Sequence, residues 1–231
     1  MSTKNLFTPI NCITIDTETA PIVPSDKVDP NNMLVYDIGY IVHDIKGNVI
    51  EKRSFVVGDI FFGESQKMQS AYYADKIPKY LEEIQRGERI VLPFRTIMNI
   101  IHDDIKKYDV TIINAYNTYF DLTVLNNTAR YLNIAKYFFP YDVIFWDTMK
   151  MISVLTGKKY DRYCHENGFI TSTGRSKKSA EVVYRYISGQ NDFIEEHRAY
   201  NDVIIELEIY KKCRSKKKKM RRELFNKDIN K

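Results

Sequence analysis

The stretch "NCITIDTETA", residues 11 to 20, has the pattern of a buried β-strand but carries two acidic residues, Asp16 and Glu18. Side chains alternate between the two faces of a strand, so these carboxylates project to the same face. Like charges this close repel each other unless a proton or a cation lies between them. Since Mg²⁺ and Mn²⁺ prefer carboxylate oxygens, the stretch predicts a divalent-metal site. The alternative is a strand end in solvent, because 30 of the 231 residues are acidic and such pairs also arise by chance.

The length and composition of the chain predict one globular protein. A chain of 231 residues, 44% of them hydrophobic, can bury a large core. It has no run of about 18 apolar residues, and its start, "MSTKNLFTPI", lacks the apolar centre of a signal peptide. We therefore expect a cytoplasmic location and no membrane partner. The cysteines Cys12, Cys164 and Cys213 have no C-x-x-C spacing, so we expect them to be reduced and expect no zinc site.

Charge is distributed unevenly along the chain. Residues 211 to 222, "KKCRSKKKKMRR", contain nine Lys or Arg and no acid, whereas the rest of the chain has 26 basic and 30 acidic residues. A basic segment of this kind can bind the phosphate backbone of nucleic acid without sequence preference. The alternative is a solvated helix end, where cations also suit the negative end of the helix dipole.

The order of predicted elements indicates an α/β protein. Three strands that form an antiparallel meander are followed by helix, strand, helix, strand and further helices, which is the order of the ribonuclease H-like fold, a mixed central sheet flanked by helices. We expect one domain over residues 1–231, with a helical insert at about 58–93 and a basic C-terminal helix or tail at about 211–231. The expected strands are 12–18, 34–44, 49–57, 110–116 and 143–147, and the expected helices are 65–87 with a break or new start at Pro78, 94–108, 121–133, 148–155, 159–167, 178–188 and 198–220.

Further acidic residues stand where the fold brings strand ends and helix starts together. Asp121, in "NAYNTYFDLTVL", follows an apolar strand and begins a helix; the alternative role is that of an acid stabilised by the helix dipole. Asp202, in "EEHRAYNDVIIELEIY", opens the apolar face of the last long helix. His197 precedes Asp202 by five residues, about 500° of helical rotation, so we expect it in the turn before the helix and over the site. A solvent-exposed histidine is the alternative.

Three segments together resemble a known family. "ITIDTET", "NAYNTYFDLTVL" and "HRAYND" resemble the three motifs of the DEDD superfamily, the DnaQ-like 3′ to 5′ exonucleases. The spacing H-x4-D resembles the DEDDh branch, and Arg198 stands where the other branch has tyrosine. The resemblance spans residues 13 to about 210, and the "AYYADK" and "SAEVVYRYI" segments resemble small stand-alone bacteriophage exonucleases. Three motifs in order are far more specific than one.

The resemblance implies a metal-dependent mechanism at these carboxylates. Two divalent ions, Mg²⁺ or Mn²⁺, would be held by Asp16, Glu18, Asp121 and Asp202. Asp16 would bridge both ions, Glu18 and Asp202 would complete the site of the ion on the nucleophile side, and Asp121 would hold the other. His197 would accept a proton from the attacking water. Nucleoside 5′-monophosphates would then be released from a 3′ end.

The resemblance also implies a substrate and its contacts. Thr17, Thr19, Asn117 and Phe120 would contact the terminal nucleotide, although Tyr116 replaces a histidine often found in the second motif. We expect single-stranded DNA, with RNA trimming as the alternative, since nothing in the sequence reads a 2′-hydroxyl. Two other classes stay open: a nucleic-acid-binding protein with an inactive site, and a proofreading subunit that docks onto a separate DNA polymerase or replication protein.

Overall fold

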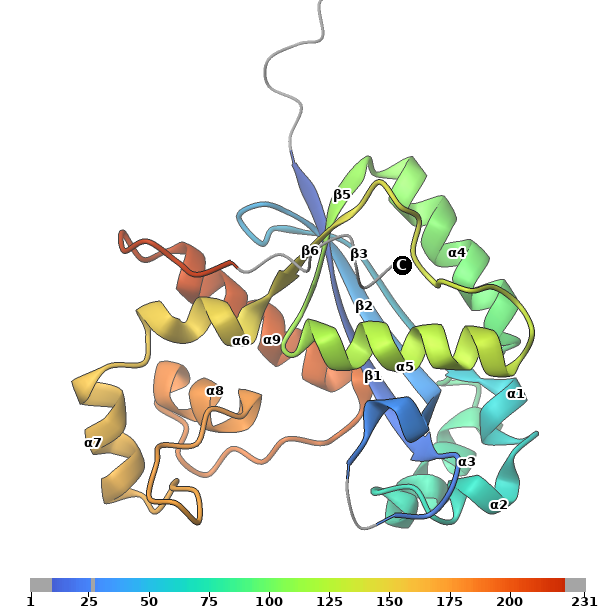
Figure 1. Cartoon of the computed structure of the whole chain (residues 1–231), viewed down its shortest axis with the longest axis horizontal. Helices are drawn as coiled ribbons and strands as arrows, with labels where there is room; N and C mark the ends of the chain where they lie inside the picture. The colour runs from blue at the N-terminus through green and yellow to red at the C-terminus, as the bar shows by residue number, and fades with distance from the viewer. Residues whose placement is uncertain (1–9, 26–27, 223–231) are drawn as a thin grey trace, which may run out of the picture.

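The computed structural model describes residues 10–25 and 28–222, and within them a six-stranded mixed sheet forms the centre of the molecule (Figure 1). The strand order is β4-β3-β2-β1-β5-β6. The first three strands pair antiparallel, whereas β4 pairs parallel with β3, β5 with β1, and β6 with β5. The ribonuclease H-like fold and its initial meander are therefore confirmed. The strands are β1 (Asn11–Pro21), β2 (Met33–Asp44), β3 (Val49–Val57), β4 (Val91–Leu92), β5 (Val110–Ala115) and β6 (Ile144–Asp147).

The helices follow the predicted order but differ from it in extent. The expected helix at 65–87 is divided, and Pro78 lies in the first turn of its last piece, where a proline needs no backbone N–H partner. The last helix ends at Arg214 rather than at residue 220, because four consecutive lysines that follow would repel one another on a helix. A short helix also follows β3 directly. The helices are α1 (Gly58–Phe61), α2 (Ser65–Met68), α3 (Ile77–Gln85), α4 (Phe94–Lys107), α5 (Thr118–Tyr131), α6 (Thr148–Met151), α7 (Lys158–Glu166), α8 (Ala180–Ser188) and α9 (Ala199–Arg214), and the short 3-10 turns are η1 (Pro30–Asn32), η2 (Ala74–Lys76) and η3 (Ile152–Val154).

The sheet separates two hydrophobic cores. Ile13 and Ile15 of β1 belong to the core that contains the apolar face of α5, whereas Cys12, on the opposite face of the strand, belongs to the core of α8 and α9. This alternation follows from the two-residue period of a strand. Figure 1 shows α5 across one side of the strands and α6 to α8 gathered with α9 on the other. Asp16 and Glu18 therefore face α9.

A glycine in β2 allows α9 to lie unusually close to the sheet. Gly39 pairs with Asp16 across the β1–β2 ladder. A Cβ atom at Gly39 would lie 2.4 Å from the backbone carbon of Ala199, the first residue of α9, which is far below any ordinary contact. The missing side chain thus lets the beginning of α9 approach the strand that carries the two motif carboxylates.

The segment between β3 and α4, residues 58–93, is tied to the sheet and to the start of α9. Arg89 forms an ion pair with Asp37 of β2 at 2.5 Å, and the Tyr80 hydroxyl donates to the same carboxylate at 2.6 Å. Arg198, which precedes α9, pairs with Glu83 of α3 at 2.5 Å. These buried contacts hold α3 beside the end of β1 where Glu18 lies.

The basic C-terminal segment leaves α9 and returns toward β6. Within the described part of this segment, the Arg222 guanidinium lies over the Trp146 ring, 4.9 Å from its centroid, and Met220 packs against the core of α9. Residues 223–231 of the expected tail lie outside the described residues. A search of the described helices finds none that is long and apolar enough to cross a membrane.

Candidate active site

A cleft of about 830 Å³ opens where the ends of β1 and β5 meet the first turns of α5 and α9. It gathers residues from all three motif segments, so that Asp16 and Asp202, 186 positions apart in the chain, line the same cleft. The nine residues that the sequence predicted for the site all line it: Asp16, Thr17, Glu18, Thr19, Asn117, Phe120, Asp121, His197 and Asp202.

Three of the carboxylates form one compact group. Oxygen atoms of Asp16, Glu18 and Asp202 all lie within 4.8 Å of one another. Glu18 and Asp202 are buried, and Asp16 is partly open to the cleft. Burial, together with repulsion from Glu195, raises the pKa of Asp202 to about 8, and burial raises the pKa of Glu18 well above its usual value, with Asp202 adding to it. Crowded, desolvated carboxylates of this kind are stabilised by a divalent cation, so the residues present fit a metal ion.

The fourth carboxylate approaches from the other side of β1. Asp121 lies in the first turn of α5 and accepts a hydrogen bond of 2.8 Å from the Thr17 hydroxyl. Burial raises its pKa to about 7, against the opposing effect of the Thr17 hydrogen bond. Thr17 points away from Asp16 and Glu18, so its hydroxyl orients Asp121. The Thr19 hydroxyl donates instead to the Met33 sulfur at 3.1 Å.

His197 lies in the turn before α9, as its spacing from Asp202 predicted. Its backbone has a φ of 50°, which is uncommon for a residue other than glycine. The imidazole stacks on the Tyr73 ring, with centroids 4.2 Å apart and planes 12° apart. Burial lowers its pKa, and the positive charge of Lys76 lowers it further, so the ring is neutral near pH 7. A neutral imidazole at the rim of an acidic cleft can accept a proton.

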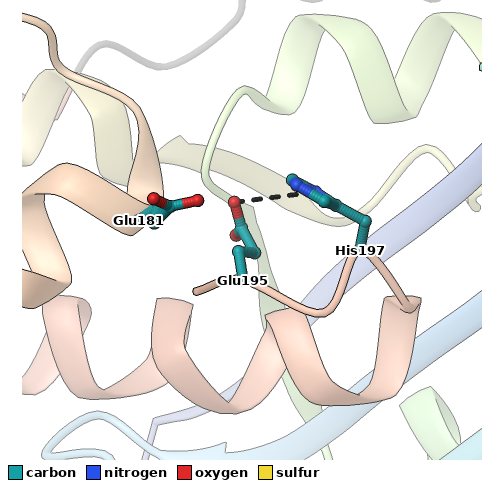
Figure 2. Close-up of side chains that lie close together, drawn as sticks. All are labelled: Glu181, Glu195 and His197. Atoms are coloured by element: carbon teal, nitrogen blue, oxygen red, sulfur yellow. Dashed lines mark ion pairs between the residues drawn. The ribbon is translucent and has the colours of Figure 1, made fainter. Parts of the chain in front are cut away.

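Two glutamates that the sequence analysis did not single out lie on one side of the histidine. Figure 2 shows Glu195 between His197 and Glu181, with its Oε2 3.8 Å from Nδ1 of the histidine. Burial, reinforced by the charge of Glu181, raises the pKa of Glu195 to about 7. Glu195 thus faces one ring nitrogen of His197. Its position two residues before the histidine is the only sign of it in the sequence.

Another carboxylate within the cleft was also missed. Glu206 follows Asp202 by four residues, which places both on one face of α9, and it is 4% exposed. Helical spacing from Asp202 would have identified it. The stacking partner Tyr73 could not be found that way, because it comes from the separate segment between β3 and α4.

The comparisons with known proteins bear on the fold. No protein-family model matches the chain, and no curated protein matches it. A 3′-exonuclease in specific recognition of the 3′ end of a histone mRNA stem-loop is 9% identical, with a TM-score of 0.60 over 94% of this chain and 90% of that one. The nuclease domain of 3′hExo, a DEDDh family member bound to rAMP, is 9% identical, with a TM-score of 0.59 over 93% of this chain and 96% of that one.

Escherichia coli Exonuclease I, in complex with a dA16 oligonucleotide, is 16% identical, with a TM-score of 0.54 over 90% of this chain. The present chain spans 41% of that longer protein. All three neighbours are described as exonucleases or as a nuclease domain, and one as a DEDDh family member; at these identities the comparison shows that the chain shares their fold. The likeness to bacteriophage enzymes stays a prediction.

Proposed function

We propose that this protein is a metal-dependent 3′ to 5′ exonuclease that acts on single-stranded DNA and releases nucleoside 5′-monophosphates. The observation that carries the proposal is the convergence of Asp16, Glu18, Asp121, His197 and Asp202 in one cleft. A structural role for each acid would not require three mutually repelling carboxylates, two of them buried, within 4.8 Å of one another. A single domain with residues 58–93 as its insert would carry the activity.

The carboxylates would hold two divalent ions. Asp16, Glu18 and Asp202 would bind one, and Asp16 and Asp121 would bind the other, with Thr17 orienting Asp121. Ions bound in this way activate a water and stabilise the charge of the phosphate and of the leaving oxygen. Mg²⁺ and Mn²⁺ fit the all-oxygen donor set.

His197 would accept the proton of the attacking water. Its lowered pKa keeps it neutral and ready to accept at pH 7 to 8. Glu195, beside Nδ1, would favour the tautomer with a proton on that nitrogen and leave Nε2 as the acceptor. Stacking on Tyr73 would restrict the ring to one orientation.

The walls of the cleft suit a 3′-terminal nucleotide. Thr19, Asn117 and Phe120 line it, and the exposed Tyr72 stands at its edge, where aromatic rings can stack on unpaired bases. RNA is the second candidate substrate, because one structural neighbour recognises a histone mRNA stem-loop and another is bound to rAMP, while a third is bound to a DNA oligonucleotide. Docking onto a polymerase would add a partner to the same chemistry.

The test is hydrolysis of matched DNA and RNA oligonucleotides by the wild type and by Asp16→Ala and Asp202→Ala. Each substitution removes a charged ligand, so both variants are expected to lose hydrolysis, as is the wild type in EDTA. A faster rate on DNA supports the proposed substrate, and a faster rate on RNA favours the second. Full activity in EDTA would rule out the metal mechanism.

A further inference from the structure

Glu206 is buried, and within the described part of the chain only one of its two carboxylate oxygens accepts a hydrogen bond. The backbone N–H of Tyr116, at the end of β5, donates a hydrogen bond to the Glu206 carboxylate. Its Oε2 is fully buried and, among the described residues, has no hydrogen-bond partner. Since an unpaired buried carboxylate oxygen is costly, a native structure normally supplies it with a proton or a cation.

Glu206 lines the cleft together with Asp16 and Asp121, and its charge acts on both. After burial, repulsion from Asp121 contributes most to the raised pKa of Glu206. After burial, repulsion from Glu206 contributes most to the raised pKa of Asp16. The charges that act most strongly on Glu206 are all negative, so no described cationic side chain compensates it to a comparable degree.

Without Glu206, the two proposed ion positions have unequal numbers of carboxylate ligands. Three carboxylates, Asp16, Glu18 and Asp202, surround the first. The second ion position has only two carboxylates: Asp16, which it shares with the first position, and Asp121. One oxygen of Asp121 already accepts a hydrogen bond from the Thr17 hydroxyl. Glu206 does not belong to the first group, but it lines the same cleft from α9.

Resting on the proposed function, we propose that Glu206 is a further ligand of the ion beside Asp121, bound directly or through one water. Tyr116 would hold one oxygen in place so that Oε2 faces the ion without losing side-chain entropy on binding. Five carboxylates rather than four would then surround the two ions.

The experiment measures Mn²⁺ binding without substrate, by electron paramagnetic resonance of free Mn²⁺ and by calorimetry. Glu206→Gln keeps the shape and an acceptor for Tyr116 but removes the charge. The wild type is expected to bind two ions, and the variant is expected to bind the second at least about 10-fold more weakly. Two ions bound with wild-type affinity by Glu206→Gln would overturn the proposal.

Two controls separate the possible failures. Glu208→Gln, on the same helix but exposed and paired with Lys211, is expected to bind both ions as the wild type does. If the wild type binds no Mn²⁺, the proposed function fails; if the wild type and Glu206→Gln bind two ions equally, only the role of Glu206 fails. Should Glu206→Gln not fold, Glu206→Asp moves the carboxylate back by one methylene and is expected to weaken the second ion, and unchanged affinity would again overturn the proposal.

Discussion

The close approach of α9 to β2 predicts that Gly39→Ala damages the site from outside the cleft. The new Cβ would lie 2.4 Å from the Ala199 carbonyl carbon and 2.5 Å from the Tyr200 nitrogen, whereas ordinary contacts begin near 3.4 Å. Both neighbours are backbone atoms and cannot rotate away, so the start of α9 must move outward by about 1 Å.

That displacement would carry two site residues with it. Asp202 lies three residues after Ala199, and His197 lies two before it. A misplacement of about 1 Å in an active site can lower a rate about 10²-fold, and overpacking of this kind typically costs about 1–3 kcal/mol of stability. We therefore expect turnover to fall about 100-fold at a temperature where the variant is still folded.

The matched control is Gly157→Ala. This glycine precedes α7; a Cβ there would meet nothing within 4 Å, and its φ of −146° is accessible to alanine. The assay compares the turnover on a single-stranded oligonucleotide, the melting temperature and the Mn²⁺ affinity of both variants. Gly39→Ala with wild-type turnover would refute the argument that this glycine sets the position of α9.

Three further outcomes are expected. His197→Ala should lower turnover by about 10² to 10⁴-fold with little change in nucleic-acid affinity. Tyr73→Phe keeps the stacked ring, so its turnover should stay near that of the wild type. Normal turnover in His197→Ala would mean that this histidine is a surface residue without a role in catalysis. The folded-state pKa of Asp202 is raised to about 8, so near neutral pH the metal-free folded protein binds more protons than the unfolded chain. Its free energy of unfolding should therefore fall by about 2 kcal/mol between about pH 6.5 and 8.5, and excess Mg²⁺ should remove most of this pH dependence. Equal slopes of stability against pH with and without metal would contradict this expectation. Replacing the exposed lysines at 216–219 by glutamine should flatten the slope of log affinity for nucleic acid against log salt concentration. The slope should change by up to about 0.7 for each phosphate of a single strand that is no longer neutralised, while turnover at saturating substrate should not change. Identical slopes for the two proteins would mean that these lysines are solvated and do not bind phosphates.

Local rules were sufficient to locate most of the site from the sequence. The two-residue period of a strand put Asp16 and Glu18 on one face, and the start of an apolar helical face marked Asp202. The distance of five residues placed His197 outside the helix, and α9 indeed begins at Ala199. These features depend on neighbours within one element, which the sequence displays directly.

What the sequence did not reveal depends on interactions between distant segments. Tyr73 stacks on His197 from a segment more than 120 residues away in the chain, and the ion pair of Glu83 and Arg198 joins the neighbouring α3 to the start of α9. The two-residue strand β4 is too short to show any periodicity, and its pairing with β3 is set by the chain that surrounds it. The helix expected at 65–87 is divided into α2, η2 and α3, a division that the local helical preference of the segment does not show.

The direction of hydrolysis tests the central claim most directly. A single-stranded oligonucleotide is labelled at its 5′ end in one reaction and at its 3′ end in another, and both are followed in time with Mg²⁺ or Mn²⁺. We expect the 5′ label to pass through a ladder of products shortened one nucleotide at a time, and the 3′ label to appear at once as a nucleoside 5′-monophosphate. A 3′ label that remains on shortened products, or products cut only at internal positions, would contradict a 3′ to 5′ exonuclease.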